Sequence, residues 1–93
     1  MLYHGSDKEI TTLMPGNFVS KHIKDAWKFG YRRAVLNNSL KVFVYAVETS
    51  AILPDPNRNG AFILQTSAAV RLITSCATYD SPFKLRVFKI KEG

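Results

Sequence analysis

Apolar residues recur every three to four positions between about residues 21 and 35, with Ile23, Trp27 and Tyr31 spaced by four. Lysines and arginines occupy the intervening positions, as on the solvent side of an amphipathic helix. Ser20 precedes this pattern and is a favoured residue type at a helix N-cap. The run 37–39, Asn-Asn-Ser, is expected to end the helix. The pattern therefore predicts one main helix in the first half of the chain.

The other apolar stretches are short and rich in β-branched and aromatic residues, which predicts strands. The stretch 40–47 is nearly all apolar and is expected to form a central strand buried on both faces. The last stretch alternates, and its phase slips at Val87-Phe88, which predicts a bulge. One helix followed mainly by strands indicates a single α+β domain over residues 1–93, with a largely antiparallel sheet. The predicted strands are 2–4, 18–20, 40–47, 62–65, 69–74 and 83–91.

Turn-forming residues divide these strands. Residues 7–16 are expected to form a loop that ends in the turn Pro15-Gly16. The segment 52–60 is expected to form a second loop, in which Asp55 stands between two prolines. Because a residue before proline is held out of the helical region, the backbone of Asp55 is expected to be extended.

Charge and cysteine content indicate which partners and which covalent or metal cross-links the chain could have. The 93 residues carry 13 Lys and Arg against 7 Asp and Glu, a net charge of +6. This balance favours an anionic partner: nucleic acid, a nucleotide, an acidic protein or an anionic membrane; it is equally explained by solubility alone. The single cysteine, Cys76, cannot form an internal disulfide and is expected in the core of a protein in a reducing compartment. No cluster of Cys and His has the spacing of a metal site.

No apolar run approaches the roughly 18 residues that span a bilayer. The first residues also lack the pattern of a secretory signal. A cytoplasmic protein with no membrane partner is therefore expected; its oligomeric state is left open.

Three features carry possible chemistry. His4 stands at the end of an apolar pair and directly before Gly5-Ser6. Phe18-Val19-Ser20 places an aromatic ring and a hydroxyl around a short strand. Asp55 is a carboxylate in a restrained loop, although aspartate is also common in ordinary turns.

In these stretches the chain resembles the mono-ADP-ribosyltransferases, and among them the small rifampin ADP-ribosyltransferase type. The similar segments lie within residues 2 to 65 and follow the family's order. That resemblance implies a split sheet with an NAD cleft, and transfer of ADP-ribose from NAD to an acceptor that the sequence does not identify. The segments are Leu2–Ser6, Phe18–Ser20 with the helix behind it, the strand 42–48 that ends in Glu48, and Pro54–Asn57.

The resemblance implies a role for each candidate residue. His4 would hold the adenosine-side ribose of NAD, Gly5 the nicotinamide amide through its backbone, and Phe18 the nicotinamide ring. Ser20 would bond the nicotinamide-side ribose. Asp55 would stabilise the positive charge that develops as the bond between ribose and nicotinamide breaks, as in glycoside cleavage.

Two departures leave an alternative open. The family pattern has tyrosine where this chain has Phe18, so the ring is kept and the hydroxyl lost. Around Gln65, where better-known branches of the family carry glutamate, there is no carboxylate. Asp55 is then the candidate acid and Glu48 the fallback. If neither serves, the chain is an inactive module of the same fold that binds NAD, nucleic acid or an acidic protein.

Overall fold

The computed structural model describes residues 1–80, in which one α-helix packs on a seven-stranded antiparallel sheet. The expected α+β class is therefore confirmed. The expected strand 83–91, with its bulge, lies outside the described residues. The helix is α1 (Ile23–Leu36), and a short 3-10 helix, η1 (Thr78–Asp80), ends this part of the chain. The strands are β1 (Leu2–Ser6), β2 (Thr12–Leu13), β3 (Phe18–Ser20), β4 (Lys41–Val47), β5 (Ile52–Pro54), β6 (Ala61–Leu64) and β7 (Ala68–Ala77).

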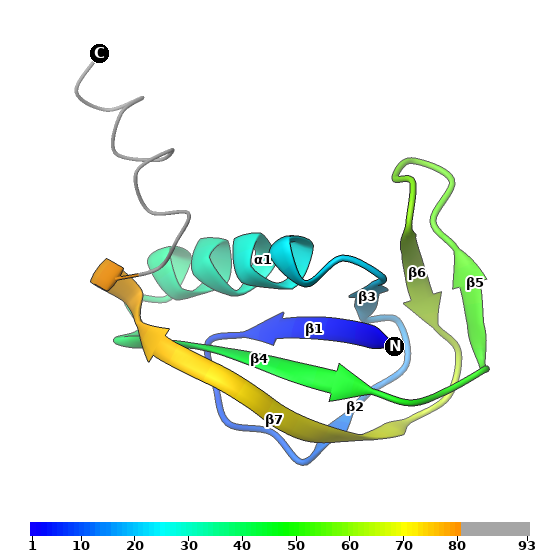
Figure 1. Cartoon of the computed structure of the whole chain (residues 1–93), viewed down its shortest axis with the longest axis horizontal. Coiled ribbons are helices and arrows are strands. Elements are labelled where there is room, and N and C mark those ends of the chain that lie inside the picture. Colours follow the sequence, from blue (N-terminus) through cyan, green and yellow to red (C-terminus); the bar gives the residue numbers. More distant parts are fainter. Residues whose placement is uncertain (81–93) are drawn as a thin grey trace.

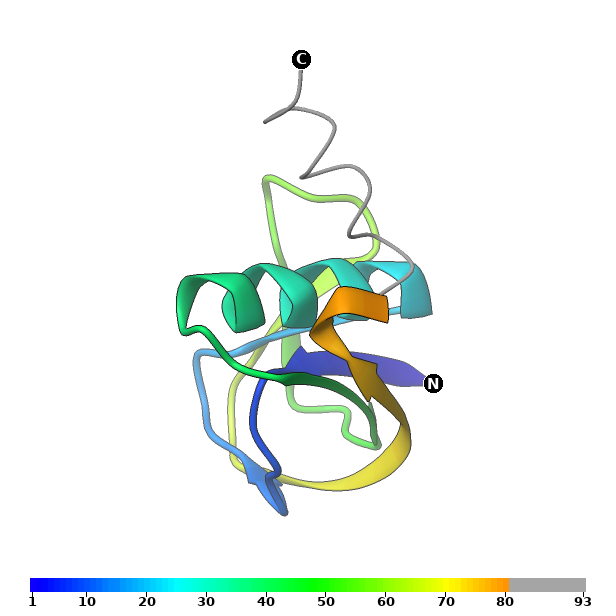
Figure 2. The same cartoon turned by 90° about the vertical axis from the view of Figure 1, so that its left-hand side faces the viewer.

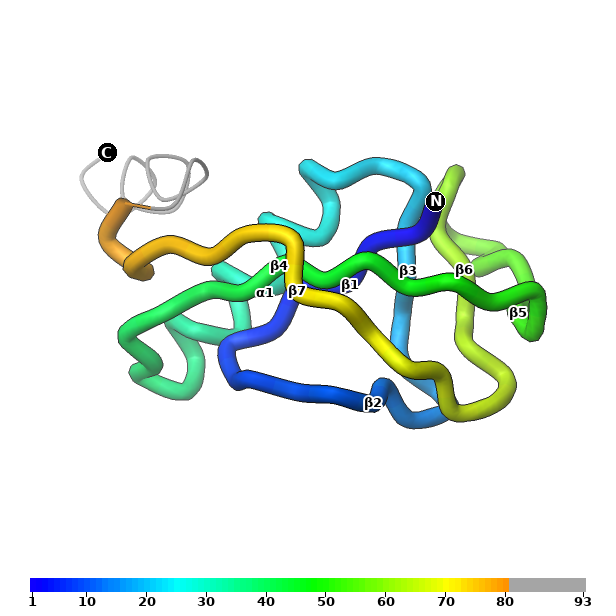
Figure 3. Tube along the Cα trace, turned by 60° about the horizontal axis from the view of Figure 1, so that its bottom comes forward, coloured from blue at the N-terminus to red at the C-terminus, as the bar shows by residue number. Residues whose placement is uncertain are grey.

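The sheet has the order β2-β7-β4-β1-β3-β6-β5 and is strongly curled. Strands β7, β4 and β1 run side by side, whereas β3, β6 and β5 cross their direction (Figures 1 and 3). The helix lies on one face, over β1 and β4 (Figure 2). The join between the two groups of strands is β1–β3, where a single register pair, Tyr3 with Ser20, holds the strands together.

Two apolar clusters hold this arrangement. One fills the curl of the sheet around Leu2, Val19 and Leu64. The other lies between the helix and the sheet, where Tyr31 and Ala34 pack on Val42. Strand β4 serves both clusters, because its residues from Val42 to Val47 are all buried, as expected for a central strand.

The helix begins later than its sequence pattern suggests. Ser20 is not its N-cap; His22 occupies that position and makes no side-chain capping bond. Ser20 remains in β3 and accepts a hydrogen bond from the His22 N–H at 3.0 Å, so it braces the entry to the helix from outside. At the other end Asn38 takes a left-handed conformation, φ 54°, which ends the helix at the expected place.

Other boundaries also differ from the sequence prediction. β1 does not stop before Gly5 but continues to Ser6, because its whole length pairs with β4. Strand β2 lies inside the expected loop 7–16, where a two-residue strand has too short a pattern to recognise. Strand β5 likewise lies in the expected loop 52–60. Cys76 is half-buried rather than fully enclosed, beside the cluster under the helix.

Candidate functional site

The sheet splits between β1 and β3, and His4 lies at the split. The backbones of Asn17 and Lys21, on either side of β3, form hydrogen bonds with Leu64 and Gly60 on the side of β6. Because successive residues of a strand direct their backbone N–H and C=O groups to opposite sides, those of Phe18 and Ser20 point towards β1. After the pair Tyr3–Ser20, a continuous ladder would next pair Gly5 with Phe18. Instead the Phe18 carbonyl accepts a hydrogen bond from His4 Nδ1 at 2.8 Å. The imidazole takes the place of one rung of the ladder.

Gly5 therefore directs its N–H and C=O to the same edge of β1, with no residue of β3 paired to it. Its missing side chain has a second reason. A Cβ atom at Gly5 would lie 1.7 Å from the backbone oxygen of Ala26 in α1. The helix thus packs directly on the strand at this point, and Gly5 combines a packing role with a backbone edge that β3 does not pair.

The hydrogen bond to Phe18 also determines the proton position on His4. Since a carbonyl only accepts, Nδ1 must carry the proton. Burial, assisted by the nearby Arg33, lowers the pKa of His4 below its ordinary value of 6.5, although the bond to Phe18 acts in the opposite direction. His4 is therefore neutral at pH 7, and its Nε2 is a hydrogen-bond acceptor. A ligand hydroxyl next to Nε2 would donate a hydrogen bond to it.

An aromatic pair forms beside the split. The rings of Phe18 and Phe29 are nearly parallel, with 4° between their planes and 6.0 Å between centroids. The Arg58 guanidinium lies over both rings, 4.8 Å from the Phe18 centroid and 4.4 Å from that of Phe29. Such positions are favourable for a cation over an aromatic face. The ring that the sequence proposes for nicotinamide is thus already covered by a cation of the chain itself.

Asp55 organises the loop that carries Arg58. Its side chain is 5% exposed, and its Oδ1 accepts a hydrogen bond from the Asn57 N–H at 2.9 Å. Its Oδ2 lies 3.5 Å from Arg58 Nε. These contacts are those of a turn aspartate, with the added effect that Asp55 helps to place Arg58 over the rings.

Ser20 is also engaged within the chain. Its hydroxyl donates to Asp25 Oδ2 at 2.8 Å, and the residue is 3% exposed. This hydrogen bond ties β3 to the first turn of α1. In this arrangement the hydroxyl is not directed to a ligand.

Several hollows adjoin these residues, among them one of about 220 Å³ that His4 and Gly5 line together with Ser6 and Asp7. Three others bear on the candidate residues. The first, of about 320 Å³, lies at the split and is here called the His4 hollow. The second, of about 520 Å³, lies between α1 and the loop of Arg58 and is called the basic hollow. The third, of about 620 Å³, lies on the other side of that loop. Phe29 and Arg32 line both the His4 hollow and the basic hollow, which are therefore neighbours.

The structure brings together His4, Gly5 and Phe18, which all line the His4 hollow. It does not bring Asp55 there; Asp55 lines the third hollow, and Arg58 is the link between it and the aromatic pair. Glu48, the fallback acid, is exposed at the end of β4 and lines none of the three.

Sequence reasoning missed Phe29 and Arg58. Phe29 is off the stripe of Trp27 and Tyr31, which packs towards β4, and this position on the helix was the available signal for a separate role. Arg58 had no such signal, because only the folded hairpin β5–β6 brings it over Phe18.

Within residues 1–80, no group of three His, Cys, Asp or Glu side chains is arranged to hold a metal ion. Neither does this part of the chain contain a helix with the length and apolar character needed to cross a membrane. Comparisons of the chain with protein-family models, curated proteins and solved structures give no match.

Proposed function

We propose that this chain is an NAD-binding protein of the ADP-ribosyltransferase type, and that NAD binds in the His4 hollow. The split between β1 and β3 is the observation that carries the proposal. There His4 replaces a rung of the sheet, and Gly5 presents an N–H and a C=O at the same edge. A primary amide such as that of nicotinamide needs one acceptor and one donor side by side, which this edge supplies.

The remaining features of the hollow agree with a nucleotide ligand. Its volume of about 320 Å³ is near the lower end of small-molecule sites, and suits the nicotinamide riboside half of NAD. Arg32 and Arg33 line it and supply positive charge for the pyrophosphate. Phe18 supplies an aromatic face for the cationic ring once Arg58 moves aside.

The proposed reaction is transfer of ADP-ribose to an acceptor. The bond from ribose C1′ to the nicotinamide nitrogen breaks, and a bond forms from C1′ to a nucleophilic oxygen or nitrogen of the acceptor. Nicotinamide leaves as a neutral molecule, and the proton of the nucleophile passes to solvent. The carboxylate of Asp55 would stabilise the developing cation. This role requires that Arg58 release Asp55 and that the loop carry the carboxylate from the third hollow to the His4 hollow.

A second candidate is a module of the same type that binds without chemistry. It is favoured by one observation: Asp55 lies outside the His4 hollow and is engaged by Asn57 and Arg58. The two candidates share NAD binding and differ in turnover, so binding and nicotinamide release must be measured separately.

The binding test is calorimetric titration of NAD into the wild type, His4→Ala and the control His22→Ala. His22 is the only other histidine, is exposed and does not line the His4 hollow. We expect heat with the wild type and the control, and a strong loss of affinity in His4→Ala. Absence of heat at millimolar NAD in the folded wild type would sink the proposal.

The catalytic test is release of nicotinamide by the wild type, Asp55→Asn and Glu48→Gln. Asparagine can still accept the hydrogen bond from Asn57 and so preserves the turn. We expect Asp55→Asn to lower turnover by about 100-fold or more, as loss of an electrostatic contact to the transition state does. Turnover that persists in Asp55→Asn would remove that residue from the reaction. Binding of NAD by the wild type without turnover would favour the second candidate.

A further inference from the structure

We infer that the basic hollow beside the NAD site binds single-stranded nucleic acid, whose strand is then the acceptor of the proposed transfer. The inference deepens the proposed function only in naming the acceptor; binding of the strand itself does not require NAD.

The charge of the hollow is the first observation. Three cations line it from two elements: Lys28 and Arg32 from α1, and Arg58 from the loop after β5. The single acid in its lining, Asp25, already accepts the hydroxyl hydrogen of Ser20. Arg58 also pairs with Asp55, which lies behind the loop. The three cations still outnumber these two acids, so the hollow has a net positive charge, which favours a negatively charged ligand.

The second observation is a flat surface next to these cations. The Phe29 ring lines the hollow, lies parallel to that of Phe18 and is covered in part by the planar guanidinium of Arg58. Phenyl rings and guanidinium groups are the surfaces on which unpaired bases stack. A ligand that is only acidic, such as an acidic peptide, would make no contact with this surface that uses its flat shape.

The shape favours a single strand over a duplex. The loop between β5 and β6 stands up beside the beginning of α1, so that it forms a wall of the hollow (Figures 1 and 2). A flexible strand can place a base between this wall and the helix. The paired bases of a duplex are stacked inside it and cannot reach the ring of Phe29.

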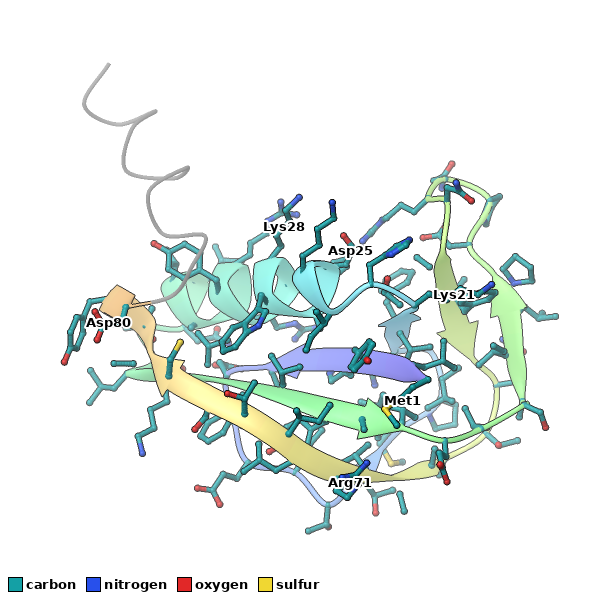
Figure 4. All side chains as sticks on the ribbon, viewed as in Figure 1. Met1, Lys21, Asp25, Lys28, Arg71 and Asp80 are labelled. Carbon is teal, nitrogen blue, oxygen red and sulfur yellow. The ribbon has the colours of Figure 1, made fainter. Side chains whose placement is uncertain are left out.

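The arrangement also leaves room for both ligands. Lys28 lines the basic hollow but not the His4 hollow, whereas Phe29 and Arg32 line both. A strand that crosses the basic hollow would thus end next to the site proposed for the ribose of NAD. Figure 4 shows Lys28 on the side of α1 that points away from the sheet, and Arg71 on β7 at the opposite side of the molecule.

The test uses fluorescence anisotropy with a labelled single strand of about 12 nucleotides, in DNA and RNA form. The variants are Lys28→Glu and the control Arg71→Glu, which makes the same change of charge on an exposed residue far from the hollow. With three phosphate contacts, we expect log K to fall with log salt with a slope of about −2, and the slope to weaken by about 0.7 in Lys28→Glu. Arg71→Glu should keep the wild-type slope. A third variant, Phe29→Leu, should lower the affinity for the strand about fivefold or more, because it removes a stacking surface.

Four results would overturn the inference. The first is that no strand binds at low salt, and the second is that Lys28→Glu and Arg71→Glu lose affinity for the strand equally. The third is that a duplex or polyglutamate binds as tightly as the strand, and the fourth is that anionic vesicles bind in place of the strand. NAD calorimetry on Lys28→Glu separates the two proposals. We expect its NAD affinity to stay within about twofold of the wild type, since Lys28 does not line the His4 hollow. If NAD fails to bind while the strand binds as described, the proposed function fails and strand binding stands.

Discussion

Replacement of Gly5 by alanine should destabilise the fold strongly. The added methyl carbon would lie 1.7 Å from the Ala26 oxygen and 2.8 Å from the Gly30 nitrogen, both backbone atoms of α1. A Cβ atom does not approach another heavy atom closer than about 3.0 Å, so the helix would have to retreat from β1 by more than 1 Å. No side chain can rotate away to relieve this contact.

The expected loss can be estimated from the two effects involved. Overpacking of a core costs about 1–3 kcal/mol and more where backbone must move, which places Gly5→Ala at the upper end. Alanine regains about 0.5–1 kcal/mol because it is less flexible than glycine in the unfolded chain. The net loss of about 2–3 kcal/mol should lower Tm by roughly 10–20 °C in a domain of this size.

The assay is urea unfolding followed by circular dichroism and by the fluorescence of Trp27, the single tryptophan. The control is Gly16→Ala. Gly16 has φ 91° and no atom within 4 Å of an added Cβ, so its loss should come from backbone strain alone and reach about 1 kcal/mol. A Gly5→Ala protein within 0.5 kcal/mol of the wild type, or one no less stable than Gly16→Ala, would refute the packing role of Gly5. For the same reason this variant is unsuitable for testing ligand binding.

Other predictions concern charge and the aromatic pair. Because the pKa of His4 is lower in the folded state, its contribution to the free energy of unfolding should be fully present above pH 6.5 and be lost as the pH drops below that value. His4→Gln should make the free energy of unfolding, measured in urea, depend less on pH in this range. An unchanged pH dependence would contradict this reasoning. Burial raises the pKa of Asp7, but hydrogen bonds from Ser39 and Asn37 outweigh this effect and leave the pKa below 3.8. Asp7→Ala should therefore lower the free energy of unfolding by about 1–3 kcal/mol at pH 7, measured by urea unfolding. If this loss does not shrink below pH 3.8, the hydrogen bonds to the carboxylate are not its cause. Arg58→Ala should tighten NAD binding by about 2- to 30-fold in calorimetry, since it frees a face held by about 0.5–2 kcal/mol of cation–π attraction; weaker NAD binding would show that Arg58 assists the ligand instead of competing with it.

Much of the architecture follows from local patterns. The spacing of Trp27 and Tyr31 predicts the helix, and the nearly all-apolar stretch 40–47 predicts the buried central strand, which the structure forms over Lys41–Val47. Short elements escaped this reasoning. Strand β2 has two residues and exists because it pairs with Ala68 and Ala69 far along the chain, which no local pattern records.

The candidate site shows the same division. The sequence by itself marked His4, Gly5 and Phe18, since a histidine before a glycine and an isolated aromatic strand are locally unusual, and these three residues do line one hollow. The sequence determined which groups are available there: an imidazole, a backbone without a side chain and an aromatic ring. The contacts of these groups with residues far along the chain form only in the tertiary structure.

Only the tertiary structure decided how those groups are used. His4 opens the split because β3 crosses β1 and offers the Phe18 carbonyl to the imidazole. Asp55 holds Arg58 over Phe18 and Phe29, and does not reach His4, because the hairpin β5–β6 folds back beside the helix. Contacts between residues 14 to 40 positions apart depend on how whole elements pack, and such packing energies are not encoded in the period of any single segment.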